Sequence, residues 1–279
     1  MLVPYHPNVN LLRRAVSKIS EGLGRESAIV TFLRPAYDRV LEWSSGERGL
    51  LQPVNDEEFR IEARHRVHFP EIYEPEVWRH VKARTGPGQV CLNIGAHMGI
   101  YALALARWTS PGGRVFAFEP NPTTRAALTR HVVLNGAADC IEVLEDAVSD
   151  VPGRSTFFAT GQEGFSRLGA SNPIAPHTAP LTVPVTTIDA FCASRGLTPD
   201  WITLDVEGYE IAALEGAHET LAKGRGRLGL IVELHPALWP EAGGARMSEL
   251  FSSVGLRAIG MTGQTDPLST YGIVLLEYV

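Results

Sequence analysis

The hydrophobic pattern of the last two-thirds of the chain alternates between short apolar runs and segments of helical periodicity. Apolar runs of strand length cover residues 89–94, 114–119, 141–148, 201–206, 228–235 and 272–278. Helical spacing occupies residues 99–108, 122–135, 209–221 and 245–254. Near-continuous apolar strands that alternate with helices are typical of a mainly parallel sheet covered on both faces. The pattern predicts an α/β domain over residues 86–279.

The first 85 residues have a different pattern. Apolar residues at helical spacing predict helices over residues 10–23 and 28–43, followed by a short hairpin through residues 42–61. Pro75 is well placed in the first turn of another helix. We interpret residues 1–85 as a helical N-terminal extension, whose apolar helices offer a surface for a homodimer.

The strand–helix alternation is interrupted between residues 151 and 183. Residues 154–160 and 181–188 read as two added strands around a polar loop rich in glycine and proline at about 160–180. A loop of this length in a compact domain is usually a lid or a binding loop, and a disordered segment is the alternative. Ser166 in this loop is a candidate contact for cofactor or acceptor, and solvent exposure is the alternative.

A glycine turn follows the first strand of the α/β domain. In VCLNIGAHMGIYALALA the strand ends near Asn93, the turn runs from Gly95 to Gly99, and a helix follows. The two glycines let the backbone pass close to a ligand, and the N-terminus of the helix favours a negatively charged group. The turn is therefore a candidate cofactor site.

Glu119 ends the next strand, twenty residues beyond Gly99. A carboxylate there can accept hydrogen bonds from both ribose hydroxyls of NAD or of S-adenosylmethionine. The dinucleotide fingerprint is G-x-G-x-x-G, whereas this turn is G-x-x-x-G and lacks the middle glycine that helps to admit a pyrophosphate. S-adenosylmethionine is therefore favoured over NAD. Asp146, after the third strand, could accept from an adenine amino group or be an ordinary loop carboxylate.

The motifs NIGAHMGIYALA, FEPNP, LNG, EDAVSD, LDVEGYEIAALEGA and IVELHP occur in this order over residues 86–236 and resemble the FkbM family of S-adenosylmethionine-dependent methyltransferases. The resemblance implies a class I methyltransferase fold, Rossmann-like with a seven-stranded sheet, and methyl transfer mostly to hydroxyl oxygens of sugars or natural products. It implies that the glycine turn binds the methionine part, Glu119 the ribose, and Asp146-Ala147 the adenine. The cofactor set expected on these grounds comprises Asn93, Gly95, Ala96, His97, Met98, Gly99, Tyr101, Glu119, Pro120, Asn121, Asp146, Ala147 and Asp205.

The chain departs from the usual family pattern at three positions. The family usually has aspartate at Asn93, asparagine at His97 and lysine at Thr203. Asn93 supplies no negative charge for the ammonium or sulfonium region of the cofactor, and Asp205 could supply that charge instead.

Four ionisable side chains end the fourth and fifth strands of the predicted sheet: Asp205, Glu207, Glu233 and His235. Strand alternation turns the two members of each pair to the same side, and open α/β sheets bind ligands at this edge. We expect these four residues to form the catalytic cleft, with His235 as a general base because an unperturbed pKa near 6.5 suits neutral pH. The structural alternatives are a charge at a helix start for Glu207 and a satisfied buried histidine for His235. A divalent metal held by the four residues is the less favoured alternative, so no metal ligand is predicted.

Composition narrows the class of acceptor. The 25 lysines and arginines against 31 aspartates and glutamates give a formal net charge of −6, which argues against nucleic acid. No apolar stretch is long enough to span a membrane, and three cysteines without a CxxC pair are typical of a reducing cytoplasm.

The sequence predicts a cytoplasmic S-adenosylmethionine-dependent O-methyltransferase that acts on a small molecule, sugar, glycan or natural product. Tyr73, Ser166 and His235 are the candidate contacts to that acceptor. The alternatives are an N-methyltransferase, an NAD-dependent oxidoreductase and a non-catalytic cofactor-binding domain.

Overall fold

The computed structural model of the chain describes residues 27–159, 166–169 and 180–279. The chain divides into two compact units, Met1–Tyr73 and Glu74–Val279. The sequence-based division was drawn after residue 85, and α3 (Pro75–Lys82) lies in the second unit. None of the described helices combines the length and the apolar character needed to cross a bilayer.

The first unit contains a long helix and a hairpin. Helix α2 (Ala28–Ser45) confirms the helix predicted over residues 28–43 and continues slightly beyond it, so the hairpin begins later than predicted. Strands β1 (Leu50–Val54) and β2 (Glu57–Ile61) pair antiparallel through a turn in which Asn55 has a φ of 51°. The helix predicted over residues 10–23 lies outside the described residues.

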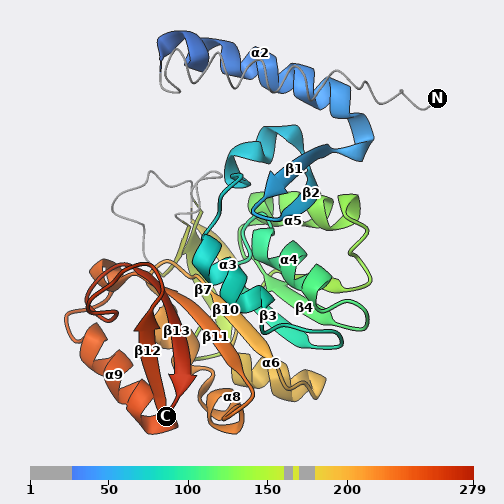
Figure 1. Cartoon of the computed structure of the whole chain (residues 1–279). Helices are drawn as coiled ribbons and strands as arrows, with labels where there is room; N and C mark the ends of the chain where they lie inside the picture. Colours follow the sequence, from blue (N-terminus) through green and yellow to red (C-terminus); the bar gives the residue numbers. More distant parts are fainter. Residues whose placement is uncertain (1–26, 160–165, 170–179) are drawn as a thin grey trace. The chain divides into compact units, whose positions relative to one another are not determined.

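The second unit is built on the predicted seven-stranded, mainly parallel sheet, which is confirmed (Figure 1). The strand order is β12-β13-β11-β10-β3-β4-β5, and β13 runs in the opposite direction to the other six strands. The strand bounds are β3 (Val90–Ile94), β4 (Arg114–Phe118), β5 (Ile141–Leu144), β10 (Trp201–Leu204), β11 (Gly229–Leu234), β12 (Leu256–Gly260) and β13 (Gly272–Tyr278).

Helices cover the sheet because its central strands are apolar on both sides. Helix α4 (Ile100–Trp108) packs on β3, β4 and β5, and α5 (Pro122–Leu134) packs on β5. Helices α6 (Ile188–Arg195), α7 (Glu210–Glu215), α8 (His218–Lys223) and α9 (Gly243–Val254) form a second group. In this group α8 contacts α6 and α9, and α7 contacts α9 (α6, α8 and α9 are labelled in Figure 1). A continuous core of buried side chains joins the sheet to this second group and includes Leu92, Phe116, Phe118, Phe191, Ile202, Leu214, Leu230 and Met247.

The two added strands predicted from the sequence are confirmed as β7 (Gly153–Phe158) and β9 (Leu181–Thr186). They belong to a separate four-stranded sheet of order β6-β9-β7-β8, with β6 (Ala147–Val148) and β8 (Arg167–Leu168). The single strand predicted over residues 141–148 is wrong: β5 ends at Leu144, and the chain then pairs with β9 in the smaller sheet.

Three further corrections concern two helical segments and one edge strand. The predicted helix over residues 209–221 divides at Gly216 and Ala217 into α7 and α8. A Cβ built on Gly216 would overlap the backbone oxygen of Ser149. Helix α6 and strand β12 were not predicted. Thr187 caps α6 by accepting a hydrogen bond from the Ala190 N–H at 3.0 Å. A threonine at this position is a sequence signal for a helix start, whereas the apolar pattern of α6 is too short to predict the helix.

Candidate active site

The turn after β3 passes directly against the end of β10. Gly95 has a φ of 76°, and a Cβ built on it overlaps the backbone oxygen of Asp205. The N–H groups of Gly95 and Ala96 donate to the Phe118 oxygen at 3.0 and 2.9 Å, and Gly99 donates to the Ala96 oxygen. The turn is thus held by the sheet, and these three N–H groups donate to backbone oxygens rather than to a ligand.

Glu119 lies beside this turn and is almost fully buried, with 6% of its surface exposed. Its two carboxylate oxygens accept hydrogen bonds from the His97 N–H at 2.8 Å and from the Asn121 N–H at 2.9 Å. Burial raises the pKa of Glu119 to about 7, against the opposing effect of these two bonds and of Arg125. The structure therefore brings the predicted turn and the predicted carboxylate together.

Two acceptor atoms near the turn are buried and have no hydrogen-bond partner among the described residues: Asn93 Oδ1 and Asp205 Oδ1. The amide of Asn93 donates to Thr203 Oγ1 at 2.9 Å, so its oxygen must face elsewhere. Buried polar atoms without a partner are costly, and they are commonly satisfied by a ligand or water. These acceptors beside a glycine without room for a side chain fit a ligand with a donor group, such as the ammonium of S-adenosylmethionine.

The segment that leads into β8 of the small sheet contacts the chain just after Glu119. Asn121 accepts from the Thr123 N–H at 3.1 Å and caps α5, while its Nδ2 donates to Ser166 Oγ at 3.3 Å. At the other end of this short described segment, a Cβ built on Gly169 overlaps the hydroxyl of Tyr209. Ser166 is thereby connected to the Asn121 side chain two residues after Glu119.

The predicted catalytic residues gather around His235, at the ends of β10 and β11. His235 Nε2 lies 3.7 Å from Glu207 Oε2, and its Nδ1 lies 2.9 Å from Glu210 Oε1. The ring of Tyr271, just before β13, lies 5.2 Å from the His235 ring, and the Tyr271 hydroxyl donates to Glu233. The expected convergence of the four groups is therefore present, and Glu207 adopts an uncommon φ of 50° to reach it.

Electrostatic coupling in this cluster is strong. Burial lowers the pKa of His235, but the hydrogen bond with Glu210 and the charges of Glu210, Asp205 and Glu207 outweigh it and raise the pKa to about 9. Burial and the charge of Glu233 hold the pKa of Asp205 well above its usual range, although His235 opposes them. Tyr271 also has a raised pKa, first from burial and then from its bond to Glu233.

Asp205, Glu207 and His235 each present a ligand-type atom, and these three atoms lie within 4.8 Å of one another. Carboxylate and imidazole groups are ordinary metal ligands, but acidic clusters of this kind are common without a metal. The prediction that these residues bind no metal is tested by removal of divalent ions, as described in the Discussion.

The remaining predicted residues lie in different surroundings. The Met98 side chain is buried, and its backbone oxygen is 2.9 Å from Nδ1 of the buried His131. Tyr101 donates to Glu74 Oε2 at 2.7 Å. Asp146 is half-buried where the chain leaves the large sheet, with a pKa raised by burial and then by Glu145, and Ala147 belongs to the core of the small sheet.

Two further predicted residues complete this set. The Pro120 oxygen accepts from Arg125 Nη1 at 3.0 Å. Tyr73 belongs to the first unit, where its N–H donates to Asn55 Oδ1 at 3.1 Å.

Sequence reasoning missed three residues around His235: Glu210, Trp239 and Tyr271. Glu210 was visible as the second glutamate of LDVEGYE, but its partners lie 25 and 29 residues away. Local periodicity carries no signal for contacts at such separations.

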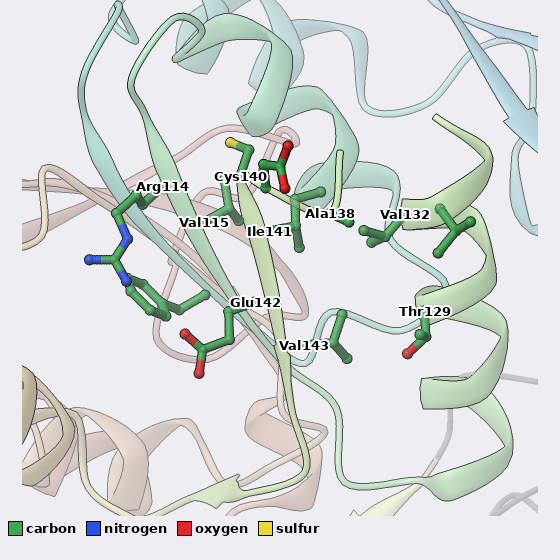
Figure 2. A pocket seen from close by; sticks show the side chains of 12 residues that line it. Arg114, Val115, Thr129, Val132, Ala138, Cys140, Ile141, Glu142 and Val143 are labelled. Carbon is green, nitrogen blue, oxygen red and sulfur yellow. The ribbon is translucent and has the colours of Figure 1, made fainter. Parts of the chain in front are cut away.

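A pocket lies elsewhere, between the edge strand β5, strand β4 and helix α5 (Figure 2). Arg114, Thr129, Val132, Cys140 and Glu142 are among its lining residues. It contains none of the predicted site residues, so it has no part in the cluster around His235.

Comparison with known proteins identifies the family of the chain. The methyltransferase FkbM domain model matches residues 93–255. The 2-O-methyltransferase NoeI of Sinorhizobium fredii (strain NBRC 101917 / NGR234) is 29% identical over 153 residues, which cover 50% of this chain and 61% of that protein. The 31-O-demethyl-FK506 methyltransferase FkbM of Streptomyces tacrolimicus is 35% identical over 101 residues, 35% of this chain and 38% of that protein. The chain thus spans less than two thirds of the length of these relatives.

Among solved structures, methyltransferase FkbM from Methylobacillus flagellatus KT is similar, with a TM-score of 0.48 and 18% identity, over 70% of this chain and 44% of that one. The domain match includes the Gly95 turn, Glu119, and the Asp205 and His235 region, and the sheet is that of a class I methyltransferase. The chain belongs to the FkbM family of S-adenosylmethionine-dependent methyltransferases.

Proposed function

We propose that this chain transfers a methyl group from S-adenosylmethionine to a hydroxyl oxygen of a small molecule, sugar, glycan or natural product. The observation that carries the proposal is the buried Glu119 carboxylate beside the Gly95 turn, in a chain of the FkbM family. One relative is named a 2-O-methyltransferase and the other a 31-O-demethyl-FK506 methyltransferase, which favours oxygen over nitrogen as the methylated atom. Family membership also favours methyl transfer over the NAD-dependent alternative.

The residues that would hold the cofactor lie on the ends of β3, β4 and β10. Glu119 would accept hydrogen bonds from the two ribose hydroxyls through lone pairs that its backbone donors leave available. Asn93 Oδ1 and Asp205 Oδ1 would accept from the ammonium group of the methionine part, because both are buried acceptors in need of a donor. The Gly95–Gly99 turn, including Ala96, His97 and Met98, would shape the wall beside the methionine part.

Five further residues complete the proposed cofactor site. Asp146 and Ala147 would border the adenine. Pro120 and Asn121, which directly follow Glu119, would lie beside the ribose. Tyr101 has its hydroxyl committed to Glu74, so we propose that it contributes through its ring.

The reacting end is the cluster around His235. When bound, S-adenosylmethionine supplies the methyl group, whose bond to sulfur breaks with its electron pair left on sulfur as the bond to the acceptor oxygen forms. The pKa of about 9 corrects the expectation of a base with an unperturbed pKa near 6.5, because His235 is mostly protonated at neutral pH. In its neutral form, whose share grows as the pH rises toward 9, His235 would take the proton of the acceptor hydroxyl at Nε2, the nitrogen on the side of Glu207. Asp205, Glu207 and Glu233 would orient the acceptor and stabilise the imidazolium that results.

The charge of the cluster limits the acceptor. Four carboxyl groups, of Asp205, Glu207, Glu210 and Glu233, surround one histidine. A phosphate or carboxylate on the acceptor would be repelled in this partly desolvated place, whereas neutral hydroxyl groups would donate to the carboxylates. We therefore infer a neutral polyhydroxylated acceptor, with Ser166 and His235 among its contacts, and we keep Tyr73 as a predicted contact from the first unit.

The experiment that tests this function is an assay with methyl-labelled S-adenosylmethionine and a panel of neutral glycans and hydroxylated natural products, followed by identification of the labelled product. We expect release of S-adenosylhomocysteine together with a labelled methyl ether. Cofactor binding without turnover on any acceptor would instead support the non-catalytic alternative, and a labelled amine would support N-methylation.

We further infer a homodimer through helix α2, with a second copy of the helix as the partner. Phe32, Val40 and Trp43 share one side of the helix and are 83%, 46% and 72% exposed. Apolar stripes of this spacing are typical of helix pairs. Light scattering should give the mass of a dimer for the native chain and of a monomer for Trp43→Glu, and a monomeric native chain would refute the inference. We keep a cytoplasmic location as an inference from the three free cysteines.

A further inference from the structure

The carboxylate of Glu210 is completely buried at the start of α7, directly behind His235. Its Oε1 accepts from the Gly208 N–H at 2.6 Å and lies 2.9 Å from His235 Nδ1, while its Oε2 accepts from Trp239 Nε1 at 2.5 Å. These three contacts come from the turn after β10, from the end of β11 and from the segment that follows it. Glu210 therefore holds together the elements that carry the cluster.

Only a carboxylate satisfies this arrangement. The Gly208 N–H and the Trp239 indole N–H can only donate, and a carboxylate can only accept, so His235 must present its own proton at Nδ1. This assignment leaves His235 Nε2 as the nitrogen on the opposite side of the ring, toward Glu207. A histidine that donates one ring N–H to a buried carboxylate has a fixed tautomer and a fixed ring plane.

We infer that Glu210 is a positioning residue that fixes His235 with Nδ1–H toward itself, so that Nε2 is the atom that takes the acceptor proton. The inference rests on the proposed function, but the tautomer that it specifies is a property of the protein alone. In the proton transfer, the O–H bond of the acceptor breaks, its proton goes to Nε2, and the electron pair stays on the oxygen that forms the new bond to carbon.

The groups that face His235 come from every neighbouring element. Glu210 lies on α7, Asp205 and Glu207 follow β10, and Tyr271 precedes β13 and donates to Glu233 on β11. Because three of these carboxyl groups act on His235 directly, its pKa is about 9 in the free protein. Removal of the Glu210 charge should lower this pKa, while removal of the more distant Glu233 should affect it less.

The decisive measurement is a pH titration of the His235 ring nitrogens by NMR on the full chain labelled with ¹⁵N-histidine, with His235→Asn to assign the signal among nine histidines. We expect Nδ1 to be the protonated nitrogen of the neutral ring and the transition to occur near pH 9. In Glu210→Gln the transition should fall by at least about one pH unit, and the ring should no longer show a single tautomer.

A double variant separates orientation from charge. The amide of Glu210→Gln must place its NH₂ against either the Trp239 indole N–H or the Gly208 and His235 donors. In Glu210→Gln/Trp239→Phe the indole N–H is gone, so the NH₂ can face the phenyl ring while the amide oxygen still accepts from His235 Nδ1. We expect this variant to regain the single tautomer but keep the lowered pKa, and Trp239→Phe alone, the matched control, to keep both native properties.

Kinetics supply the second readout. We expect the rising limb of kcat against pH to move to lower pH in Glu210→Gln, with the plateau reduced about 10²-fold or more and the KM for S-adenosylmethionine nearly unchanged. Recovery of part of the plateau in the double variant would support positioning. A native His235 titration and tautomer in Glu210→Gln would overturn the inference.

Failure of the proposed function would look different, because the titration is independent of turnover. A chain with the expected His235 tautomer that never transfers a methyl group would retain the Glu210–His235 relationship and refute the proposed reaction. Retained affinity of each variant for S-adenosylhomocysteine would show that the fold is intact.

Discussion

The backbone oxygen of Asp205 occupies the space in which Gly95 would carry a side chain. This contact joins the turn after β3 to the end of β10, and these two elements supply the proposed cofactor wall and the proposed catalytic cluster. Gly95 also has a positive φ of 76°, so a side chain there is opposed by both the backbone conformation and the space.

The first prediction concerns this contact. Gly95→Ala should lower the free energy of unfolding by more than about 2 kcal/mol, because strain and overlap with backbone add together, and it should abolish binding of S-adenosylhomocysteine. Denaturant unfolding and calorimetry measure the two effects. Gly136→Ala is a matched control, since Gly136 has a φ of 63° with no atom within 4 Å of a built Cβ, and it should cost only about 1 kcal/mol. Equal losses in both variants would refute the close-contact explanation.

The second prediction concerns the pH dependence of cofactor affinity. Glu119 has a pKa of about 7 in the free protein, and the ribose hydroxyls are expected to donate to its ionised form. A proton must therefore leave Glu119 on binding at lower pH, and the affinity for S-adenosylhomocysteine should fall about tenfold from pH 8 to pH 6. Isothermal calorimetry over this range measures the dependence.

The control for that dependence is Glu119→Gln, which should bind more weakly at pH 8 and lose the slope. The exposed Glu145→Gln should keep it. A slope that persists in Glu119→Gln would assign the titration to another group.

The third prediction uses the family's usual aspartate. Asn93→Asp would replace the amide that donates to Thr203 Oγ1 by a carboxylate that can only accept from this hydroxyl, and it would add a second buried carboxyl group to the proposed ammonium site. The added charge should favour the sulfonium S-adenosylmethionine over neutral-sulfur S-adenosylhomocysteine by several-fold, and it should destabilise the free protein by about 1–3 kcal/mol through repulsion. Calorimetry with both ligands compares their affinities, and an unchanged ratio would show that position 93 does not act on the sulfonium by charge.

The fourth prediction concerns divalent metal. The Nε2 atom of neutral His235 provides a site for the acceptor's proton without a metal, so incubation with EDTA followed by gel filtration should leave turnover unchanged. The experiment addresses the alternative that Asp205, Glu207 and His235 bind a metal, since one ligand-type atom of each lies within 4.8 Å of the others. Loss of turnover that added Mg²⁺ or Mn²⁺ restores would instead assign these residues as ligands.

The parts of the fold that repeat a local pattern were predictable. The apolar runs of β3, β4, β10, β11 and β13 and the turn at Gly95 follow from residues that are adjacent in sequence. Strand β12 escaped because it lies at the edge of the sheet with Arg257 exposed, so it has no continuous apolar run. The break between β5 and β6 depends on pairing with β9, which no local pattern encodes.

The candidate site was predictable to a similar extent. Asp205, Glu207 and His235 come together because the parallel strands β10 and β11 end at the same edge. Strand alternation does not apply to them, because β10 ends at Leu204 and Glu207 has a φ of 50°. The roles of Glu210 and Trp239 depend on a buried three-donor arrangement around one carboxylate. Such a network is visible only when the turn after β10 and the segment after β11 are placed in space.

Calorimetric titration of the purified native chain with S-adenosylmethionine and with S-adenosylhomocysteine tests the central claim most directly. The account predicts one site per chain with micromolar or tighter affinity for both ligands, greatly weakened in Glu119→Gln, and no heat with NAD. Absence of binding to both ligands by a folded chain, or binding that is unaffected by Glu119→Gln, would contradict it.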